Sequence, residues 1–212
     1  MSNREPSEVH GITGALLHRE PRDRHSTRNP LARALYQRYL QDVTEMVQRL
    51  DPRTVLEVGC GAGHFVEVLR KALPEARIVG VDLSERMVRE AREHVPGVEF
   101  LVGSAYDLPY DDGSFDLVVA AEVLETLHDP QKALREIVRV THRHALLSVA
   151  RQPHWRALNM VRLAWLDEMG HHPGHVQDLN KGDFMRMVRG HFRVVEARDP
   201  LPWVIVSARK GG

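Results

Sequence analysis

The sequence predicts an α/β fold in which a doubly wound, mostly parallel sheet carries helices on both faces. Short apolar segments alternate along the chain with longer segments whose apolar residues recur at helical spacing. Prolines at positions 74, 96, 109 and 130 separate these segments, which is typical of loops between strands and helices. Two further strand-like segments near the end of the chain lie a short loop apart, so we expect them to pair antiparallel.

These patterns place the expected elements in order along the chain. Strands are expected over residues 54–58, 77–81, 98–102, 115–120, 144–150, 192–196 and 203–207. Helices are expected over residues 31–50, 63–73, 84–94, 130–140, 155–168 and 181–190. Asn29 and Pro30 mark the start of the first helix, because an asparagine side chain can cap a helix and proline suits its first position.

The chain divides into an arm and one domain. Residues 1–30 are polar, rich in Arg and His and without periodicity, which predicts an N-terminal arm. Residues 31–212 are predicted to form a single domain, since 212 residues fit one domain with a substantial core. Within it, residues 151–190 form an insertion after the fifth strand.

Composition excludes several classes of function. Lys plus Arg and Asp plus Glu both total 29, so the formal net charge is zero, which argues against bulk electrostatic binding of nucleic acid. The single cysteine, Cys60, excludes an internal disulfide. No apolar run approaches the ~20 residues of a membrane span, and the N-terminus lacks the apolar core of a signal peptide, so a cytoplasmic protein is expected.

A glycine-rich turn is the most informative motif. Residues 55–63 read V-L-E-V-G-C-G-A-G, and the following strand ends in Asp82. This strand, turn, helix and acid are typical of a nucleotide site, where glycines allow close backbone approach and the acid accepts hydrogen bonds from a ribose diol. The G-x-G-x-G spacing and Glu57 do not fit a dinucleotide pyrophosphate. They favour a ligand that carries a cation and an amino group.

The sequence resembles the class I S-adenosylmethionine-dependent methyltransferases. The resemblance rests on E-V-G-C-G-A-G at 57–63, V-D-L-S at 81–84, F-D-L-V at 115–118 and E-V-L-E-T-L-H-D-P at 122–130. It covers roughly residues 53–150. It implies a seven-stranded, mostly parallel sheet with an antiparallel last strand, S-adenosylmethionine as cofactor, and transfer of its methyl group to a nucleophile.

The resemblance also implies a set of cofactor-binding residues. They are Glu57, Gly59, Cys60, Gly61, Gly63, Asp82, Leu83, Met87, Ser104, Ala105, Tyr106, Glu122 and Val123. Glu122 would face the sulfonium end of the cofactor, whereas Glu125 is expected to have a structural role. Ser104 stands where the family often has Asp. It is expected either to bond adenine weakly or to cap the local turn.

The acceptor side is less defined by sequence. A thiol or an unprotonated amine needs no base, whereas a hydroxyl acceptor does, and the candidates for that base are His128, His154, His172 and His175. A metal site at the histidines of residues 171–175 is not favoured, because no cysteine lies nearby and Pro173 restricts the loop. The expected acceptor is a small molecule, held beneath the insertion as a lid. A non-catalytic interaction module and a nicotinamide-dependent dehydrogenase are the alternatives, and the acceptor atom and oligomeric state stay open.

Overall fold

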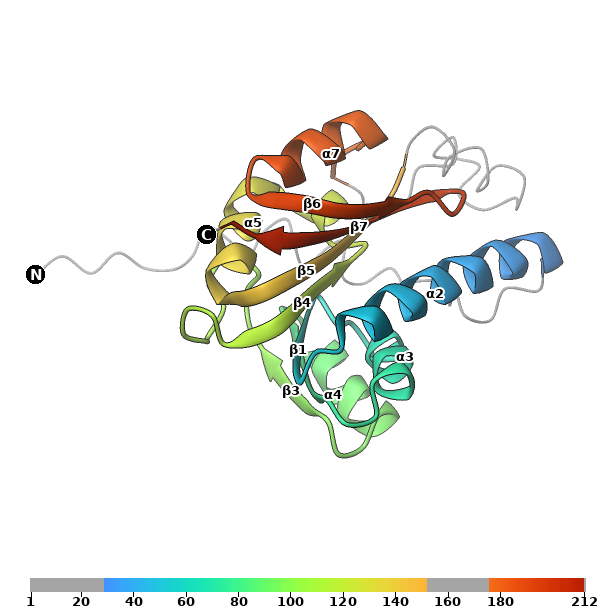
Figure 1. Ribbon diagram of the computed structural model, residues 1–212. Helices are drawn as coiled ribbons and strands as arrows, with labels where there is room; N and C mark the ends of the chain where they lie inside the picture. The colour runs from blue at the N-terminus through green and yellow to red at the C-terminus, as the bar shows by residue number, and fades with distance from the viewer. Residues whose placement is uncertain (1–28, 152–175, 212) are drawn as a thin grey trace, which may run out of the picture.

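A seven-stranded sheet forms the centre of the protein in a computed structural model that describes residues 29–151 and 176–211. The strands are β1 (Thr54–Val58), β2 (Arg77–Asp82), β3 (Glu99–Val102), β4 (Phe115–Ala121), β5 (Thr141–Ala150), β6 (Phe192–Arg198) and β7 (Trp203–Lys210). Their order is β3-β2-β1-β4-β5-β7-β6, and only β7 runs antiparallel to its neighbours (Figure 1). The predicted fold class is confirmed.

Helices cover both faces of the sheet. In the described residues they are α2 (Pro30–Leu50), α3 (His64–Ala72), α4 (Glu85–His94), α5 (Pro130–Val140), α7 (Lys181–Arg189) and the 3-10 turn η2 (Leu124–Thr126). Buried residues of α2, α3 and α4 join one apolar core, and those of α5 and α7 join the other (Figure 1). No helix in this part of the chain is both long and apolar enough to cross a membrane.

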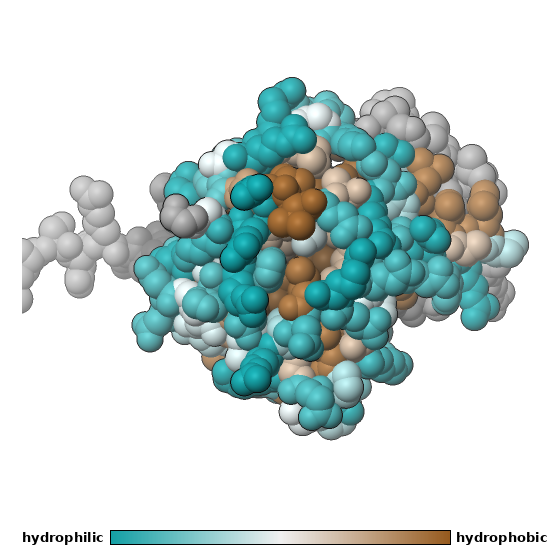
Figure 2. Space-filling model, in the orientation of Figure 1, coloured by the Kyte–Doolittle hydropathy of each residue, from teal (hydrophilic) through white to brown (hydrophobic). Residues whose placement is uncertain are grey.

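The central strands divide their side chains between the two cores. In β4, Leu117 and Val119 belong to the core beneath α2–α4, whereas Val118 and Ala120 belong to the core beneath α5 and α7. Because both faces are buried, such strands appear in the sequence as continuous apolar runs. The surface shown in Figure 2 is mainly hydrophilic, with small apolar patches, as expected when the apolar residues are largely enclosed.

The start of α2 agrees with the sequence prediction, whereas the start of β5 differs from it. The Asn29 side chain accepts hydrogen bonds from the amides of Leu31 and Ala32, at 3.0 and 3.2 Å, so the predicted cap is confirmed. In contrast, β5 begins at Thr141 rather than at residue 144, since Thr141 pairs with Phe115 in β4. The predicted helix at 155–168 and residues 1–28 of the predicted arm lie outside the described residues.

Asp116 joins the starts of two central strands. Its Oδ2 accepts hydrogen bonds from the amides of Arg53 and Thr54 at 3.0 and 3.2 Å, and its own amide donates to Thr54 Oγ1 at 2.9 Å. Partial burial alone would raise the pKa of Asp116, but the hydrogen bonds outweigh burial and hold it below 3.8, its ordinary value. The carboxylate therefore sets the register of β1 against β4.

We expect Asp116→Ala to lower the free energy of unfolding by about 2 kcal/mol at pH 7, the usual loss for hydrogen bonds to a charged group. Because the folded pKa is depressed, this stabilisation is present above the ordinary pKa and is lost as pH falls through the folded pKa. Urea unfolding at pH 7 and pH 3 measures both effects. Asp111→Ala, which removes an exposed acid from the loop before β4, is the control, and an equal loss in both variants would contradict the assignment.

Candidate ligand site at the carboxyl edge of the sheet

The glycine turn after β1 leaves one position open. Gly59, Gly61 and Gly63 all adopt positive φ, at 73°, 51° and 83°. A Cβ on Gly59 would come within 2.5 Å of Val123 Cγ2, so packing excludes a side chain there. A Cβ on Gly61 would meet no protein atom within 4 Å. The backbone at Gly61 therefore faces space that a ligand can enter.

Asp82 ties this turn to the next one. Its Oδ2 accepts a hydrogen bond from the Gly61 amide at 2.9 Å, and its Oδ1 accepts one from the Ser84 amide at 2.9 Å. Ser84 in turn caps α4, since its hydroxyl accepts from the Met87 amide at 3.4 Å. Each carboxylate oxygen retains a further lone pair, so Asp82 can still accept hydrogen bonds from a ligand beside Gly61.

Glu57 is a buried carboxylate beneath the turn. It is 2% exposed, and its Oε2 is buried without a hydrogen-bond partner among the described residues. Burial, with the nearby charge of Asp82, raises the pKa of Glu57 well above 4.5. Cys60 is also buried here, and burial together with Glu57 and Asp82 raises the pKa of its thiol, which makes it an unreactive packing residue.

Two exposed apolar side chains lie at the ends of β2 and β3. Leu83 is 59% exposed and Val102 is 47% exposed, and Val102 pairs with Asp82 in the sheet. Large apolar residues exposed beside a polar loop suit an apolar, flat ligand group. Leu83 was predicted as a site residue and Val102 was not, although an apolar residue at the strand end before Gly103 was the available signal.

The loop after β3 is organised by its own hydrogen bonds. The Ser104 hydroxyl accepts from the Tyr106 amide at 3.2 Å, and the Ser104 carbonyl accepts from the Asp107 amide at 3.1 Å. Ser104 thus forms the local turn that was one of its two expected roles. The Tyr106 hydroxyl accepts from the Asp129 amide at 3.1 Å, which fixes this loop against the start of α5. Ala105 lies between them, half-buried.

Glu122, directly after β4, adopts a strained backbone. Its φ is 58°, which is unusual for a residue other than glycine, and its amide donates to the Ser148 carbonyl at 2.9 Å. Tyr39 of α2 lies near it, hydrogen-bonded to the Ser148 hydroxyl at 2.8 Å. Burial, followed by the charge of Glu122, raises the pKa of Tyr39. The predicted site therefore extends to α2.

An aromatic cluster surrounds Tyr39. Its ring lies 4.9 Å from that of Trp203 at the start of β7 and 5.9 Å from that of Tyr36, centroid to centroid. None of these three residues was predicted as a site residue. The only available signal was their apolar spacing on a helix and a strand, which indicates a buried face but not the edge of the sheet at which that face lies.

Glu125 joins the end of β5 to residues within the predicted insertion. Its buried Oε1 accepts from the Ala150 amide at 3.0 Å, and its carbonyl accepts from the amides of Val176 and Gln177 at 2.9 and 3.1 Å. The expected structural role of Glu125 agrees with these contacts. Of the predicted base candidates, His128 is exposed on the adjoining loop, whereas His154, His172 and His175 lie outside the described residues. In the described ranges no group of three or more His, Cys, Asp or Glu side chains could hold a metal.

Comparison with known proteins identifies this arrangement. Residues 56–149 match the model of a family described as "Methyltransferase domain". This part of the chain is similar to the class I methyltransferases. The resemblance predicted from the motifs is thereby confirmed, and the predicted enzyme class and cofactor are those of the family.

Similar proteins share this domain. The chain is 33% identical over 107 residues to demethylmenaquinone methyltransferase of Thermotoga maritima, a match that covers 50% of this chain and 47% of that protein. The chain thus spans less than half the length of the curated relatives it matches.

Among solved structures, a protein of Pyrococcus horikoshii has a TM-score of 0.67 at 20% identity, over 83% of this chain and 91% of that one. Magnesium protoporphyrin IX methyltransferase of Synechocystis PCC 6803, with bound SAH, has a TM-score of 0.64 at 19% identity, over 87% and 89%. At these identities the likeness establishes the fold.

In this part of the chain we expect Glu57→Gln to raise the free energy of unfolding at pH 7 by roughly 1–3 kcal/mol, because glutamine is neutral at every pH, whereas the buried carboxyl must either keep its proton or bury a charge. The folded pKa is raised, so the folded state keeps the proton more tightly than the unfolded state. The contribution of Glu57 to stability is therefore most favourable below pH 4.5 and declines as pH rises towards the folded pKa. Urea unfolding between pH 4 and pH 9 should show this fall in the wild type and a smaller one in Glu57→Gln.

The matched control for Glu57→Gln is Glu75→Gln, which changes an exposed acid in the loop before β2. It should leave the pH profile unchanged. A Glu57→Gln variant that is less stable than the wild type at pH 7 would mean that the carboxylate is stabilised by an interaction in the folded protein.

Proposed function

We propose that this chain binds S-adenosylmethionine at the carboxyl edge of its sheet and catalyses transfer of the methyl group to a small-molecule acceptor. The observation that carries the proposal is the open backbone at Gly61, held by Asp82 across the β1 and β2 loops. In an open parallel sheet the ligand binds at this edge. The match of residues 56–149 to the methyltransferase domain supports the same assignment.

The side chains at this edge suit each part of the proposed cofactor. Asp82 offers carboxylate lone pairs to a ribose diol, and exposed Leu83 and Val102 offer apolar contact to a purine ring. The cationic methionine end is matched by Glu122 and by Glu57, because a cation beside a buried carboxyl favours its ionised form. Most of the other proposed cofactor residues lie in the loops that follow the same strands, and one lies in the first turn of α4. Those in the loops are Gly59, Cys60, Gly63, Ser104, Ala105, Tyr106 and Val123, and the one in α4 is Met87.

When bound, S-adenosylmethionine supplies an activated methyl group on a sulfonium. The contribution of the chain is to hold the donor, align the acceptor and exclude water. For a hydroxyl acceptor His128 is the described candidate for a base, and His154, His172 and His175 stay predictions. Residues 151–190 as acceptor lid and residues 1–30 as an arm beside it are likewise proposals.

The small-molecule nature of the acceptor rests on two supports. The formal net charge of zero gives no bulk attraction for nucleic acid. Two of the similar proteins are named for methyl transfer to demethylmenaquinone and to magnesium protoporphyrin IX, which are small organic molecules. Glu125 holds residue 150, next to the start of the insertion, and residues 176 and 177 within the insertion at the edge where the cofactor is proposed to bind.

We expect Asp82→Ala to weaken the affinity for S-adenosylhomocysteine about 10- to 150-fold, the loss of a charge-assisted hydrogen bond of roughly 1.5–3 kcal/mol. Calorimetry measures it. Since Asp82 also holds the Gly61 and Ser84 amides, the 2′-deoxy analogue of this ligand is measured in parallel. The wild type should discriminate between the two ligands, and Asp82→Ala should bind them alike. Undiminished discrimination in the variant would refute the ribose contact.

Gly61→Val should abolish measurable binding of the same ligand while the sheet survives. Its side chain enters the open space beside the turn, and the matched control is Gly97→Val. Gly97 has φ of +84° and open space around its Cβ, so it carries comparable backbone strain in the turn after α4. Far-ultraviolet circular dichroism reports the fold of both variants. Equal affinity in both variants would place the ligand elsewhere.

Methyl transfer itself is tested with cofactor labelled on the methyl group and an extract of small metabolites. We expect label in an organic-soluble or water-soluble product with the wild type and none with Gly61→Val. Titration with a nicotinamide dinucleotide, expected to show no binding, tests the dehydrogenase alternative. Tight S-adenosylmethionine binding without any labelled product would favour the non-catalytic interaction module.

A further inference from the structure

The edge of the sheet opposite the proposed cofactor site is the one where β5 and β6 begin and β7 ends (Figure 1). A hollow lies at this amino edge. It has a volume of about 350 Å³ and is lined by His142, Arg143, Arg193, Arg209, Lys210 and Gly211. Four of these six residues are permanently cationic at neutral pH and none is acidic. In a chain whose formal net charge is zero, this is a local excess of positive charge.

The strand register forces two of these cations together. Arg193 of β6 lies directly opposite Arg209 of β7, so their side chains leave the same face of the sheet. Like charges directly opposite each other on neighbouring strands are destabilising. Neither guanidinium, nor that of Arg143, forms a hydrogen bond or ion pair with any described residue. The cost of this pairing is therefore not offset within the described chain.

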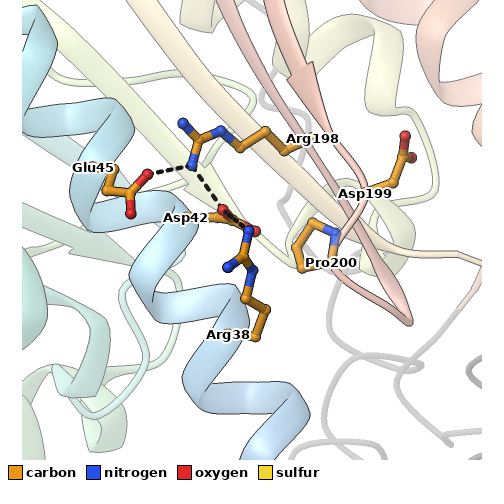
Figure 3. A pocket seen from close by; sticks show the side chains of 6 residues that line it. All are labelled: Arg38, Asp42, Glu45, Arg198, Asp199 and Pro200. Atoms are coloured by element: carbon orange, nitrogen blue, oxygen red, sulfur yellow. Dashed lines mark hydrogen bonds and ion pairs between the residues drawn. The ribbon is translucent and has the colours of Figure 1, made fainter.

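In another cavity of the protein, the cationic side chains are paired with carboxylates. Between α2 and the β6–β7 loop, a cavity of about 440 Å³ contains Arg38, Asp42, Glu45 and Arg198 (Figure 3). There Arg198 donates to Asp42 at 2.7 Å and to Glu45 at 2.8 Å, and Arg38 lies 3.2 Å from Asp42. Each cation faces a carboxylate of this chain, so that cavity has no need of a bound anion.

Around the basic hollow, Lys210 and the nearby Asp116 already form hydrogen bonds within the protein. The Lys210 ammonium donates to the carbonyls of Arg139 and Thr141 at 3.2 and 2.8 Å, which holds it in place with a proton to spare. The charge of Arg143 helps to lower the pKa of Asp116, but the Asp116 carboxylate accepts its hydrogen bonds from Arg53 and Thr54. Neighbouring His144 is affected by the same field: burial, then Arg143 and Arg209, lowers its pKa.

We infer that this basic hollow is a binding site for the phosphate group of a small anion. Arginine guanidinium groups bind phosphate oxygens in a planar, bidentate geometry, and a lysine ammonium adds a point charge. The volume suits one small phosphorylated molecule, whereas nucleic acid requires an extended basic stripe. The phosphate could belong to a free metabolite or to a phospholipid headgroup. The site lies across the sheet from the proposed cofactor site, so the two can be tested separately.

Calorimetry of the full chain with pyrophosphate, at constant ionic strength, tests the inference. We expect binding in the wild type and about tenfold weaker binding in Arg193→Gln and in Arg209→Gln, as for the loss of a charge-assisted hydrogen bond. Arg89→Gln, the same charge change on α4, should bind as the wild type does. Absence of binding in the wild type, or an equal loss in Arg89→Gln, overturns the inference.

Thermal unfolding separates loss of a ligand site from loss of structure. Without phosphate, Arg193→Gln and Arg209→Gln should unfold at the same temperature as the wild type or higher, because each relieves the like-charge pair. With pyrophosphate, the wild type and Arg89→Gln should gain more stability than either hollow variant. A lower melting temperature of both hollow variants without phosphate would show that the arginines serve the fold, against the inference.

Vesicle sedimentation identifies the source of the phosphate. Binding to phosphatidylglycerol vesicles but not to phosphatidylcholine vesicles, competed by pyrophosphate, assigns a headgroup. Pyrophosphate binding without vesicle binding assigns a free phosphorylated molecule. Vesicle binding that is unchanged in Arg193→Gln and Arg209→Gln belongs to another surface and contradicts a headgroup at this hollow.

Discussion

The carboxylate of Asp82 is the constraint on which the carboxyl edge of the sheet depends. As the last residue of β2, it is held in place by pairing with β3, and its two oxygens fix the amides of Gly61 and Ser84. One oxygen thus sets the turn after β1 and the other sets the start of α4. The amides of Gly59 and Cys60 also donate to the Val81 carbonyl, at 2.7 and 3.0 Å, so the end of β2 holds the turn after β1 at three points. The geometry of the site is therefore largely a property of the sheet.

The same edge concentrates features that cost folding free energy. Among residues 29–151 and 176–211, no group hydrogen-bonds the buried Oε2 of Glu57, and Glu122 holds a left-handed backbone that a β-carbon disfavours. Neither feature improves the packing of the core around it, since Leu56 and Val58 of β1 and Val118 and Ala120 of β4 are already buried. A chain that keeps an unpaired acid and a strained acid at one edge gains from them only when something cationic is bound there, which is the charge of the proposed cofactor.

Local patterns account for what the sequence predicted, and distant contacts account for what it did not. The glycine turn, Asp82 and the Asn29 cap depend on neighbours within a few residues or on the end of a strand, so their chemistry can be recognised from spacing. The bond from Tyr39 to Ser148 joins residues 109 positions apart, and no local pattern encodes it. The first residues of β5 are polar, so the apolar pattern did not indicate that the strand begins at Thr141. Of the two roles expected for Ser104, the local turn is the one that its bond to the Tyr106 amide, two residues away, shows.

The parallel topology explains why a chain with zero net charge has two edges of opposite character. Helices that follow parallel strands begin at the carboxyl edge, so the N-termini of α3, α4 and α5 and their partial positive charge lie beside Glu57, Asp82 and Glu122. Their C-termini point to the amino edge, where Lys210 donates to carbonyls at the end of α5. One cation satisfies that helix end. The three arginines beside it exceed what the helix requires, and the opposed pair of Arg193 and Arg209 is explained by an anion rather than by the fold. Net charge therefore excludes a polyanion spread over the whole surface, and it does not address a single phosphate at one edge.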